Sequence, residues 1–406
     1  MKKLVKKTIS KIVDNTINRP LWVQHCSQTL YQSALGCIRM WDETGDLKWQ
    51  LRAEKVVHLI LESQQPDGGF DIGYRFNFGY PHKVGESTSP ELPGLLALAE
   101  YLSKQADPQT LAAAERAMSW IERFAFKTEV NGEWAIPYGP YSSIDVVNYN
   151  GVSFACGALG KYLSVFGGTE RQKEMYSGFV RYLQRVSSTS EEYPGCFWYY
   201  ADQEDPNISE SQKGKIDFYH QMQQVEMHSI AERVLSAPGQ LQLVQGAADH
   251  IVAYYNKHGF VPYTPCGQYF GGHIHTWGYC SVASGLLEAA SLLPDRSEEY
   301  REVASEVGSW LMENAYRDGS FIPVITTGGV SVDSNSYVRT DAWVFNTMCA
   351  LEMYLGSGVW TSAIDPVWER MKKADFSGPE NHARPRSGKL FFSALKSIRR
   401  MTKSSG

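Results

Sequence analysis

One stretch of the chain carries a stripe of polar side chains that could perform acid–base chemistry. After Asp217, the residues His220, Gln224 and His228 recur every four positions, which places them on one face of a helix. Buried polar groups need hydrogen-bond partners, so such a stripe on a buried helix predicts a wet cavity or a ligand. We interpret Asp217 and His220 as catalytic candidates, with Gln224 and His228 as substrate ligands. The alternative is a hydrogen-bonded structural face.

A second polar segment places His273 and His275 between two glycines and Trp277. Histidine transfers protons near neutral pH, and a tryptophan ring can stack on a sugar. A metal site would need further ligands, and the sequence does not show His220 or Asp217 converging on this pair. We therefore predict catalysis by His275 and substrate binding by His273 and Trp277, with no metal; a purely structural loop is the alternative.

A third segment runs from Tyr337 to Asp341. In the functional interpretation, Arg339 binds a carboxylate, Asp341 acts as an acid or base, and Tyr337 is a further candidate base. The alternative is that Thr340 or Asp341 only caps the helix that follows.

Other candidates precede two more helical patterns. Asp145 and Tyr149 are catalytic candidates, and Asn148 between them is a candidate substrate ligand. Glu86 is a further substrate-binding candidate, but a Ser-Pro pair three residues later is typical of a helix start, so this segment favours a structural role. The chain has 11 Trp and 23 Tyr, more than a plain helical bundle needs. Most serve core packing, but the excess also suits sugar stacking, and we include Trp134 among the substrate-binding candidates.

An internal repeat must position these segments. Glycine-aromatic turns recur at intervals of 64, 63, 64 and 60 residues, marked by Gly68, Gly132, Gly195, Gly259 and Gly319. Each turn follows an amphipathic helical pattern. Glycine adopts positive φ without strain, so we expect it to end the helix and the aromatic residue to fold back onto the helix end.

A second, more apolar helix precedes each amphipathic one, which predicts six pairs with an inner and an outer member. Inner helices are predicted over 25–41, 90–103, 151–165, 220–235, 277–292 and 340–355. Outer helices are predicted over 51–63, 111–126, 171–186, 241–256, 298–316 and 361–373. The inner-to-outer connections are short and the return connections are long. The long ones should crowd one face, at the N-terminal ends of the inner helices, where they are either functional or simply cap the ring.

The segment Gln-x-x-Asp-Gly-Gly-Phe at 64–70, together with the period of about 63 residues, resembles the (α/α)6 toroids. These include six-hairpin glycosidases, polysaccharide lyases, the helical domain of glucuronyl C5-epimerases, and terpene cyclase and prenyltransferase toroids. The resemblance covers roughly residues 22–375 and implies an all-α toroid of six inner and six outer helices, with minor β-hairpins in the long loops. The sequence is also loosely similar to proteins of bacterial exopolysaccharide gene clusters.

The charge distribution divides the chain into three parts. Residues 1–19 carry a net charge of +5, residues 383–406 carry +7, and the body between them carries −17. An acidic body argues against a nucleic-acid-binding domain. Both ends pair an apolar helical face with lysines and arginines, which favours attachment to an anionic membrane surface over a packed or disordered tail. We predict a toroid over 20–375, a basic amphipathic segment over 1–19, and a linker with a basic tail over 376–406.

The remaining features limit the cellular compartment and the classes of reaction that the sequence allows. Seven cysteines, with no closely spaced pair, indicate buried reduced thiols, and we find no signal peptide and no apolar run of membrane-spanning length. We therefore predict a cytoplasmic protein, held at the inner face of the membrane by its ends. The acidic motif of class II terpene cyclases, the zinc motif of prenyltransferases, the P-loop and the dinucleotide fingerprint are all absent, so isoprenoid chemistry is disfavoured and no cofactor is expected.

The sequence thus predicts a carbohydrate-active enzyme for a polysaccharide or lipid-linked oligosaccharide. Hydrolysis would need two carboxylates across the scissile bond, for which the candidates are Asp145, Asp217 and Asp341. Lyase or C5-epimerase chemistry would need a base and a partner for the uronate; the candidates are Tyr149, His220, His275, Tyr337 and Arg339. The density of His and Tyr slightly favours uronate chemistry. The alternative is a non-catalytic glycan-binding or scaffolding toroid.

Overall fold

Helices make up most of the described chain, and short strands are confined to the connections between them. The computed structural model describes residues 25–377, except 74–76, 79, 142–145, 203–213, 234, 266–272, 318 and 334–336. The inner helices are α2 (Ser27–Thr44), α4 (Pro93–Leu102), α6 (Tyr149–Phe166), α8 (Phe218–Glu232), α10 (Thr276–Ala290) and α12 (Val338–Leu355). The outer helices are α3 (Leu47–Ser63), α5 (Pro108–Phe124), α7 (Glu170–Arg185), α9 (Gln240–His258), α11 (Ser297–Trp310) and α13 (Thr361–Lys373).

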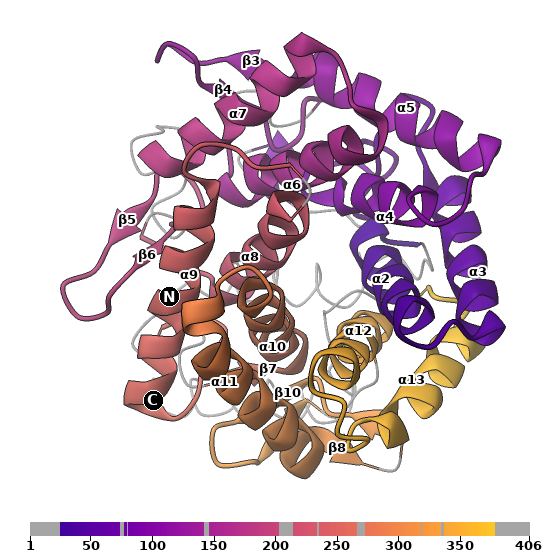
Figure 1. The fold of residues 1–406 in the computed structure, drawn as a ribbon, viewed down its shortest axis with the longest axis vertical. Helices are drawn as coiled ribbons and strands as arrows, with labels where there is room; N and C mark the ends of the chain where they lie inside the picture. The colour runs from indigo at the N-terminus through magenta and orange to yellow at the C-terminus, as the bar shows by residue number, and fades with distance from the viewer. Residues whose placement is uncertain are drawn as a thin grey trace, which may run out of the picture.

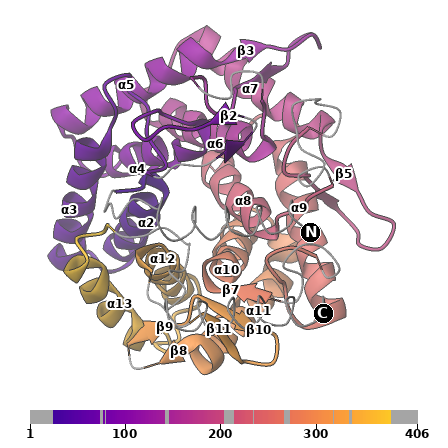
Figure 2. The same cartoon turned by 180° about the vertical axis from the view of Figure 1, so that it is seen from behind.

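These helices form two concentric rings (Figure 1). Each inner helix packs on the next inner helix and on its own outer partner, and α12 packs on α2 to close the ring. The predicted six pairs and the predicted (α/α)6 fold class are therefore confirmed. Short connections lie on the face seen in Figure 1, and long connections with their strands lie on the face seen in Figure 2.

Burial explains the two kinds of helix. Every residue of α10 is buried, whereas α7 buries one side and exposes its charged side to water. Glycines let the inner helices approach closely, since a Cβ at Gly157 would lie 2.8 Å from Met227, and one at Gly285 would lie 2.5 Å from the carbonyl oxygen of Met222. The inner ring therefore depends on small residues at its contacts.

Within the described residues, the named strands form four small hairpins and one three-stranded sheet. The four hairpins have strands of two residues each: β1–β2 (Asn77–Phe78, Tyr80–Pro81), β3–β4 (Phe126–Lys127, Trp134–Ala135), β5–β6 (Ser188–Thr189, Cys196–Phe197) and β8–β9 (Tyr316–Arg317, Ser320–Phe321). A three-stranded antiparallel sheet joins β7 (His273–His275), β10 (Val324–Thr326) and β11 (Ser331–Asp333). Within this sheet His275 pairs with Val324, which ties the start of α10 to the connection before α12. Short helical turns Ser89–Glu91 and Pro294–Arg296 precede α4 and α11, and the π-helical turn Leu311–Ala315 extends α11.

Most of the glycine-aromatic turns have a different place from the one we predicted. All five marker glycines have positive φ, but within the described chain only Gly259 directly caps its helix; Gly132, Gly195 and Gly319 lie in the small hairpins. The turn at Gly259 agrees with the prediction, since Phe260 contacts His258 at the end of α9. The other four turns meet the next outer helix instead. An added Cβ would lie 2.4 Å from the Arg116 carbonyl at Gly68, and 2.1 Å from the Gly246 carbonyl at Gly195. The repeat therefore joins neighbouring outer helices at the rim.

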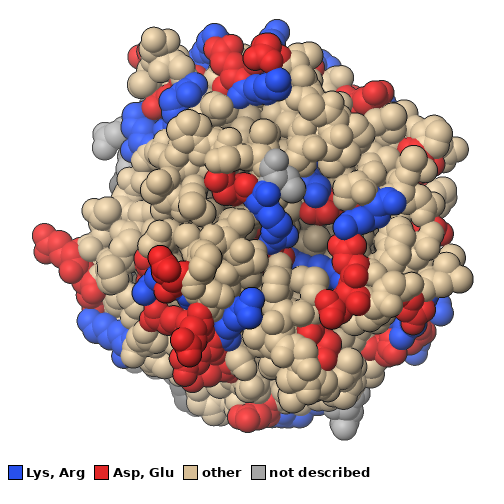
Figure 3. Space-filling model, viewed as in Figure 1, with Lys and Arg blue, Asp and Glu red and all other residues tan. Residues whose placement is uncertain are grey.

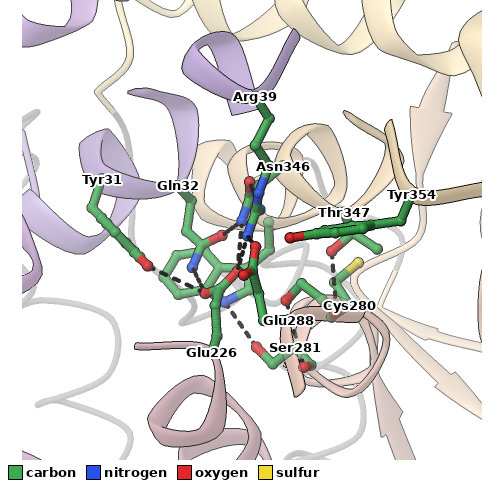
Figure 4. A network of polar contacts seen from close by, with 12 residues as sticks. Tyr31, Gln32, Arg39, Glu226, Cys280, Ser281, Glu288, Asn346, Thr347 and Tyr354 are labelled. Carbon is green, nitrogen blue, oxygen red and sulfur yellow. Dashed lines mark hydrogen bonds and ion pairs between the residues drawn. The ribbon is translucent and has the colours of Figure 1, made fainter. Parts of the chain in front are cut away.

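A buried charge network links the inner helices α2, α8, α10 and α12 (Figure 4). The guanidinium of Arg39 on α2 contacts Asn346 on α12, lies 3.2 Å from Glu226 on α8, and also pairs with Glu288 on α10. Burial raises the pKa of Glu288, but Arg233 and Arg39 outweigh this, so the pKa is lowered and the carboxylate stays charged. On the surface of the face seen in Figure 1, basic and acidic side chains also lie next to one another (Figure 3).

Two further predictions concern cysteines and membrane spans. Six cysteines lie among the described residues, all of them free thiols and all but Cys196 fully buried, as predicted; Cys266 lies outside the described residues. Across the part of the chain that the structure describes, no helix combines the length and the apolar character needed to cross a bilayer. The basic segments 1–19 and 378–406 lie outside the described residues.

Candidate functional site

The first turn of α8 joins Asp217 and His220 into a hydrogen-bonded pair. Asp217 is the N-cap of the helix, and its Oδ1 accepts the backbone N–H of His220 at 3.3 Å. Its Oδ2 lies 2.9 Å from Nδ1 of the His220 imidazole. A carboxylate can only accept, so Nδ1 carries the proton and Nε2 is left as the acceptor of a neutral ring. The geometry therefore prepares Nε2 of His220 to act as a base.

Electrostatics keep this pair in the form that a base requires. Burial raises the pKa of Asp217, but the neighbouring His220 and Lys215 and their hydrogen bonds outweigh it, so its pKa lies well below the ordinary value. Burial lowers the pKa of His220 by more than the Asp217 charge raises it. At neutral pH the site therefore holds an ionised carboxylate beside an uncharged imidazole.

Aromatic side chains surround the imidazole of His220. Its ring centroid lies 4.4 Å from that of Tyr219, 5.5 Å from that of Tyr200 and 6.1 Å from that of Phe154. The imidazole itself is partly accessible, with 13% of its side chain exposed. Lys215 lies 3.2 Å from Oδ2 of Asp217 and stacks over Tyr200. An imidazole in these surroundings is desolvated but still reachable from the long-loop face.

Side chains from three inner helices meet at the hydroxyl of Tyr219, the residue before His220. The hydroxyl of Tyr219 on α8 donates to Oε1 of Gln28 on α2 at 3.0 Å and accepts from Arg339 on α12 at 2.6 Å. The Glu91 carboxylate holds Gln28 in turn, accepting its side-chain amide at 3.0 Å and its backbone N–H at 3.1 Å. Arg339 also lies over the ring of Trp343 at 4.8 Å. A buried guanidinium is thus fixed against Tyr219, the neighbour of His220, and its charge reaches the imidazole, so it can stabilise an anionic oxygen near it.

His275 and Trp277 form a neighbouring wall at the start of α10. The Tyr263 ring stacks on His275 at 4.5 Å, and Trp277 meets His275 edge-on at 4.5 Å. The backbone of Tyr263 is held at both ends. Its carbonyl accepts the backbone N–H of Phe218, and its own N–H donates to the backbone carbonyl of His273. Burial lowers the pKa of His275 to about 4, although Asp217 opposes the shift. This second imidazole is uncharged at neutral pH and lies within the electrostatic reach of Asp217.

Several predicted residues are not brought to this cluster. Asp341 lies nearly opposite Arg339 around α12, and its Oδ2 pairs with Arg370 on the outer helix α13 at 3.2 Å. Burial raises its pKa to about 6. The ring of Tyr149 contacts Tyr182 on the outer helix α7 at 6.1 Å. These two contacts join the rings of the fold.

The far end of the predicted stripe is also structural in its contacts. His228 lies between Ser153, with Nε2 at 2.6 Å from the hydroxyl, and Gln240, with Nδ1 at 2.9 Å from the amide. Its burial lowers the pKa to about 4. Gln224, one turn earlier on the same face, is buried and its Oε1 has no partner among the described residues.

The other candidates have separate positions, and of these the Asn148 side chain reaches the cluster through an interaction with the Tyr200 hydroxyl. Trp134 packs against α7, where Gly178 gives it room, and the Glu86 carboxylate accepts the N–H of Lys83. Asn148 is the N-cap of α6, with its backbone bridged to Ala201, and Tyr337 is the buried N-cap of α12. Asp145 lies outside the described residues.

Sequence reasoning missed several members of the site. Tyr219 and Glu91 lie at helix starts beside residues that the sequence marks, but a tyrosine or glutamate in such a position is as often structural. Lys215, Tyr200 and Tyr263 lie in long connections without a repeating pattern, so no spacing marks them. Within the described ranges, no group of three or more His, Cys, Asp or Glu could hold a metal ion.

Comparison with known proteins shows the fold. The sequence matches no protein-family model and no curated protein. Among solved structures, cellobiose 2-epimerase from Bacillus thermoamylovorans B4167 is similar, with a TM-score of 0.60 and 11% identity over 81% of this chain and 87% of that one. A glycoside hydrolase of family 105 from C. acetobutylicum ATCC 824 has a TM-score of 0.58 and 13% identity over 87% of this chain and 99% of that one. A polysaccharide lyase has a TM-score of 0.58 and 13% identity, covering 82% and 92%. These likenesses confirm the six-hairpin (α/α)6 toroid.

Proposed function

We propose that this protein is a carbohydrate-active enzyme that removes a proton from a sugar carbon next to a carbonyl or carboxylate group. The observation that supports this most strongly is the Asp217–His220 pair, in which a buried ionised carboxylate accepts from Nδ1 and leaves Nε2 as a base. The substrate is a polysaccharide or a lipid-linked oligosaccharide. The names of the similar structures, which include an epimerase and a polysaccharide lyase, agree with this class of reaction.

Each part of the site has a role in such a step. Nε2 of His220 takes the proton, and the C–H bonding electrons move onto the neighbouring carbonyl or carboxylate oxygen. Arg339 stabilises the negative charge that develops there, with Tyr219 holding the guanidinium in place. Return of a proton from water to the other face of the carbon, with release of the first proton from His220 to water, gives an epimer. Expulsion of the glycosidic oxygen at the next carbon, which leaves as an alcohol, gives an unsaturated lyase product.

Hydrolysis is less well supported by the described residues. It requires an acid and a base or nucleophile about 5–10 Å apart across the scissile bond. Asp217 is engaged with His220 and Lys215, Asp341 pairs with Arg370, and Glu91 accepts from Ser27 and Gln28.

Mass spectrometry of the products tests the proposal and separates the three reactions. We would incubate the protein with a panel of neutral and uronate-containing oligosaccharides. Epimerisation leaves the mass unchanged while chromatographic retention shifts, elimination splits the chain without adding water, and hydrolysis adds one water. We expect one of the first two outcomes, lost in His220→Asn and retained in His58→Asn, an exposed histidine on α3. Addition of water would contradict the proposal.

The alternative is a glycan-binding or scaffolding toroid without catalysis. Alanine variants of Asp145, Asp217, His220 and Asp341, tested for function in cells, separate the two. If all four variants stay folded and functional, the catalytic proposal fails. We expect the Asp217 and His220 variants to lose function.

The termini add a proposal about location. We propose that the basic amphipathic segments 1–19 and 376–406 hold the toroid at an anionic membrane surface on the cytoplasmic side. The measurement is co-sedimentation of the full chain and of a chain lacking 384–406 with vesicles of phosphatidylcholine and phosphatidylglycerol. We expect the deletion to weaken binding to anionic vesicles. Equal binding of both chains would contradict the role of the tail.

A further inference from the structure

We infer that Lys215 is a positioning residue, which holds Asp217 in its ionised form and helps to keep the His220 imidazole hydrogen-bonded to it uncharged. This inference rests on the proposed function for its catalytic meaning. The Lys215 ammonium lies 3.2 Å from Oδ2 of Asp217, the same oxygen that accepts from Nδ1 of His220 at 2.9 Å. The other oxygen, Oδ1, accepts a backbone N–H of α8. Both carboxylate oxygens are therefore held.

The lysine itself is held in place, unlike an ordinary surface lysine. Its backbone carbonyl accepts the N–H of Tyr200 at 2.8 Å, and its neighbour Ile216 forms a β-bridge with Tyr199. Its ammonium lies 4.1 Å above the centroid of the Tyr200 ring and 5.7 Å from that of Tyr263, with 28% of the side chain exposed. Two aromatic faces and one carboxylate thus define a single position for the charge.

This position decides which protons the pair carries. A buried carboxylate with only an imidazole for a partner can exchange its charge for a shared proton, whereas a fixed ammonium on the same oxygen favours the ionised form. The ionised form accepts from Nδ1, so Nε2 remains the free acceptor. The ammonium also disfavours a second positive charge on His220, as does Arg339, and the pKa shift of His220 includes both contributions.

Other groups face the pair from every neighbouring element. Tyr219 on α8 and Phe154 on α6 contact the imidazole, Tyr200 and Tyr263 come from the long connections, His275 comes from α10, and Arg339 comes from α12. Among the groups in this set, the ammonium of Lys215 is the cation nearest to the carboxylate, since Arg339 contacts Tyr219 instead. Removal of its charge should therefore have an effect that the other groups do not replace.

Nuclear magnetic resonance of the histidine side chains tests the inference without any substrate. The signal of His220 is identified by its absence in His220→Asn, and its titration is compared in the wild type, Lys215→Met and Lys215→Arg. Loss of the positive charge should raise the pKa of His220 by on the order of one pH unit in Lys215→Met. Lys215→Arg should restore it. An unchanged pKa in a folded Lys215→Met variant would overturn the inference.

Turnover gives a second readout with a matched control. The acidic limb of kcat against pH should move upward with the pKa in Lys215→Met and return in Lys215→Arg. Lys127→Met is the control, because Lys127 also pairs with a carboxylate, Glu174 at 2.8 Å, and lies over an aromatic ring, Trp134 at 5.4 Å, but far along the chain from this site. If no turnover is found, the titration still decides the inference. If turnover is found but the titration does not change, the inference fails alone.

Discussion

At the scale of single residues, the two carboxylate oxygens of Asp217 have different partners. One oxygen caps α8 and the other holds the imidazole of His220, so the same side chain serves the fold and the chemistry. These two roles can be separated, because asparagine caps a helix about as well as aspartate but carries no charge. If Asp217 only caps the helix, its replacement by asparagine should change neither the fold nor the activity.

Asp217→Asn should leave the fold intact and reduce kcat by about 100-fold or more, because the neutral amide neither fixes the Nδ1–H form nor stabilises the imidazolium. Asp107→Asn is the matched control, since Asp107 caps α5 through Thr110 in the same manner. Thermal unfolding and kcat are measured for both variants. Equal kcat in the two would exclude Asp217 from the reaction.

A second residue-scale prediction concerns His228, which is buried and uncharged between Ser153 and Gln240. Its pKa of about 4 lies below the ordinary value of 6.5, so between these two pH values the unfolded chain binds a proton that the folded chain does not. Stability should therefore fall as the pH falls from 6.5 to 4, by up to about 3 kcal/mol from this residue.

Urea unfolding across this pH range, in the wild type and in His228→Gln, is the check. The variant should be less stable at pH 7 because its hydrogen bonds are lost, but its stability should depend less on pH. His250 and His275, whose pKa values are also about 4, should keep part of the slope in both proteins. Parallel curves would show that His228 does not contribute.

At the scale of elements, most of the glycine turns pack against the next outer helix and so connect neighbouring outer helices. Gly195 has a φ of +89°, and a Cβ there would lie 2.1 Å from the carbonyl of Gly246 on α9. Gly259 has a φ of +75° with nothing within 4 Å. Both glycines have a backbone conformation that would be strained for a residue with a Cβ, and they differ in the space around them.

Gly195→Ala should therefore lower the free energy of unfolding by more than about 2 kcal/mol, and Gly259→Ala by about 1 kcal/mol. Chemical denaturation of both variants measures the difference. A cost at Gly195 no greater than that at Gly259 would mean that the hairpin does not bear on α9.

The sequence predicted the elements well because their signals are local. The alternation of apolar and amphipathic helices is a periodic pattern, and the predicted ranges match the helices to within a few residues at most ends. Of the candidate site residues, Asp217, His220, His275, Trp277 and Arg339 lie in one cluster, and their role in a reaction stays a prediction. Asp341 and Tyr149 were placed by their nearness to helix starts, but a helix turns by 100° per residue, so neighbours in sequence face different rings. Lys215 and Tyr263 could not be found, because only tertiary packing brings the long connections to α8.

At the scale of the whole molecule, buried ion pairs link inner helices of the ring in addition to apolar packing. Arg39 joins α2 to α8, α10 and α12, and the charged groups that it contacts are almost completely buried. Removing one partner of a buried ion pair leaves an uncompensated charge in a medium that solvates it poorly. The network is therefore sensitive to the loss of this one guanidinium.

Arg39→Met should destabilise the protein by about 3–5 kcal/mol, since it leaves Glu226 without its ion-pair partner and Glu288 with Arg233 alone. Lys48→Met, which breaks an exposed pair with Asp365, should cost less than about 1 kcal/mol. Denaturant unfolding of both variants provides the comparison. Similar small losses would show that apolar packing holds the inner helices together.

The central claim is that His220 takes a proton from a sugar carbon, and the uptake of solvent deuterium tests it most directly. The wild type, His220→Asn and His58→Asn are incubated with the oligosaccharide panel in heavy water, and proton resonance signals of the recovered sugars are compared. We expect one ring C–H signal to disappear, or the product to carry one carbon-bound deuterium, with the wild type and His58→Asn but not with His220→Asn. Conversion of a sugar by the wild type with no deuterium on carbon, or equal uptake with His220→Asn, would contradict the claim.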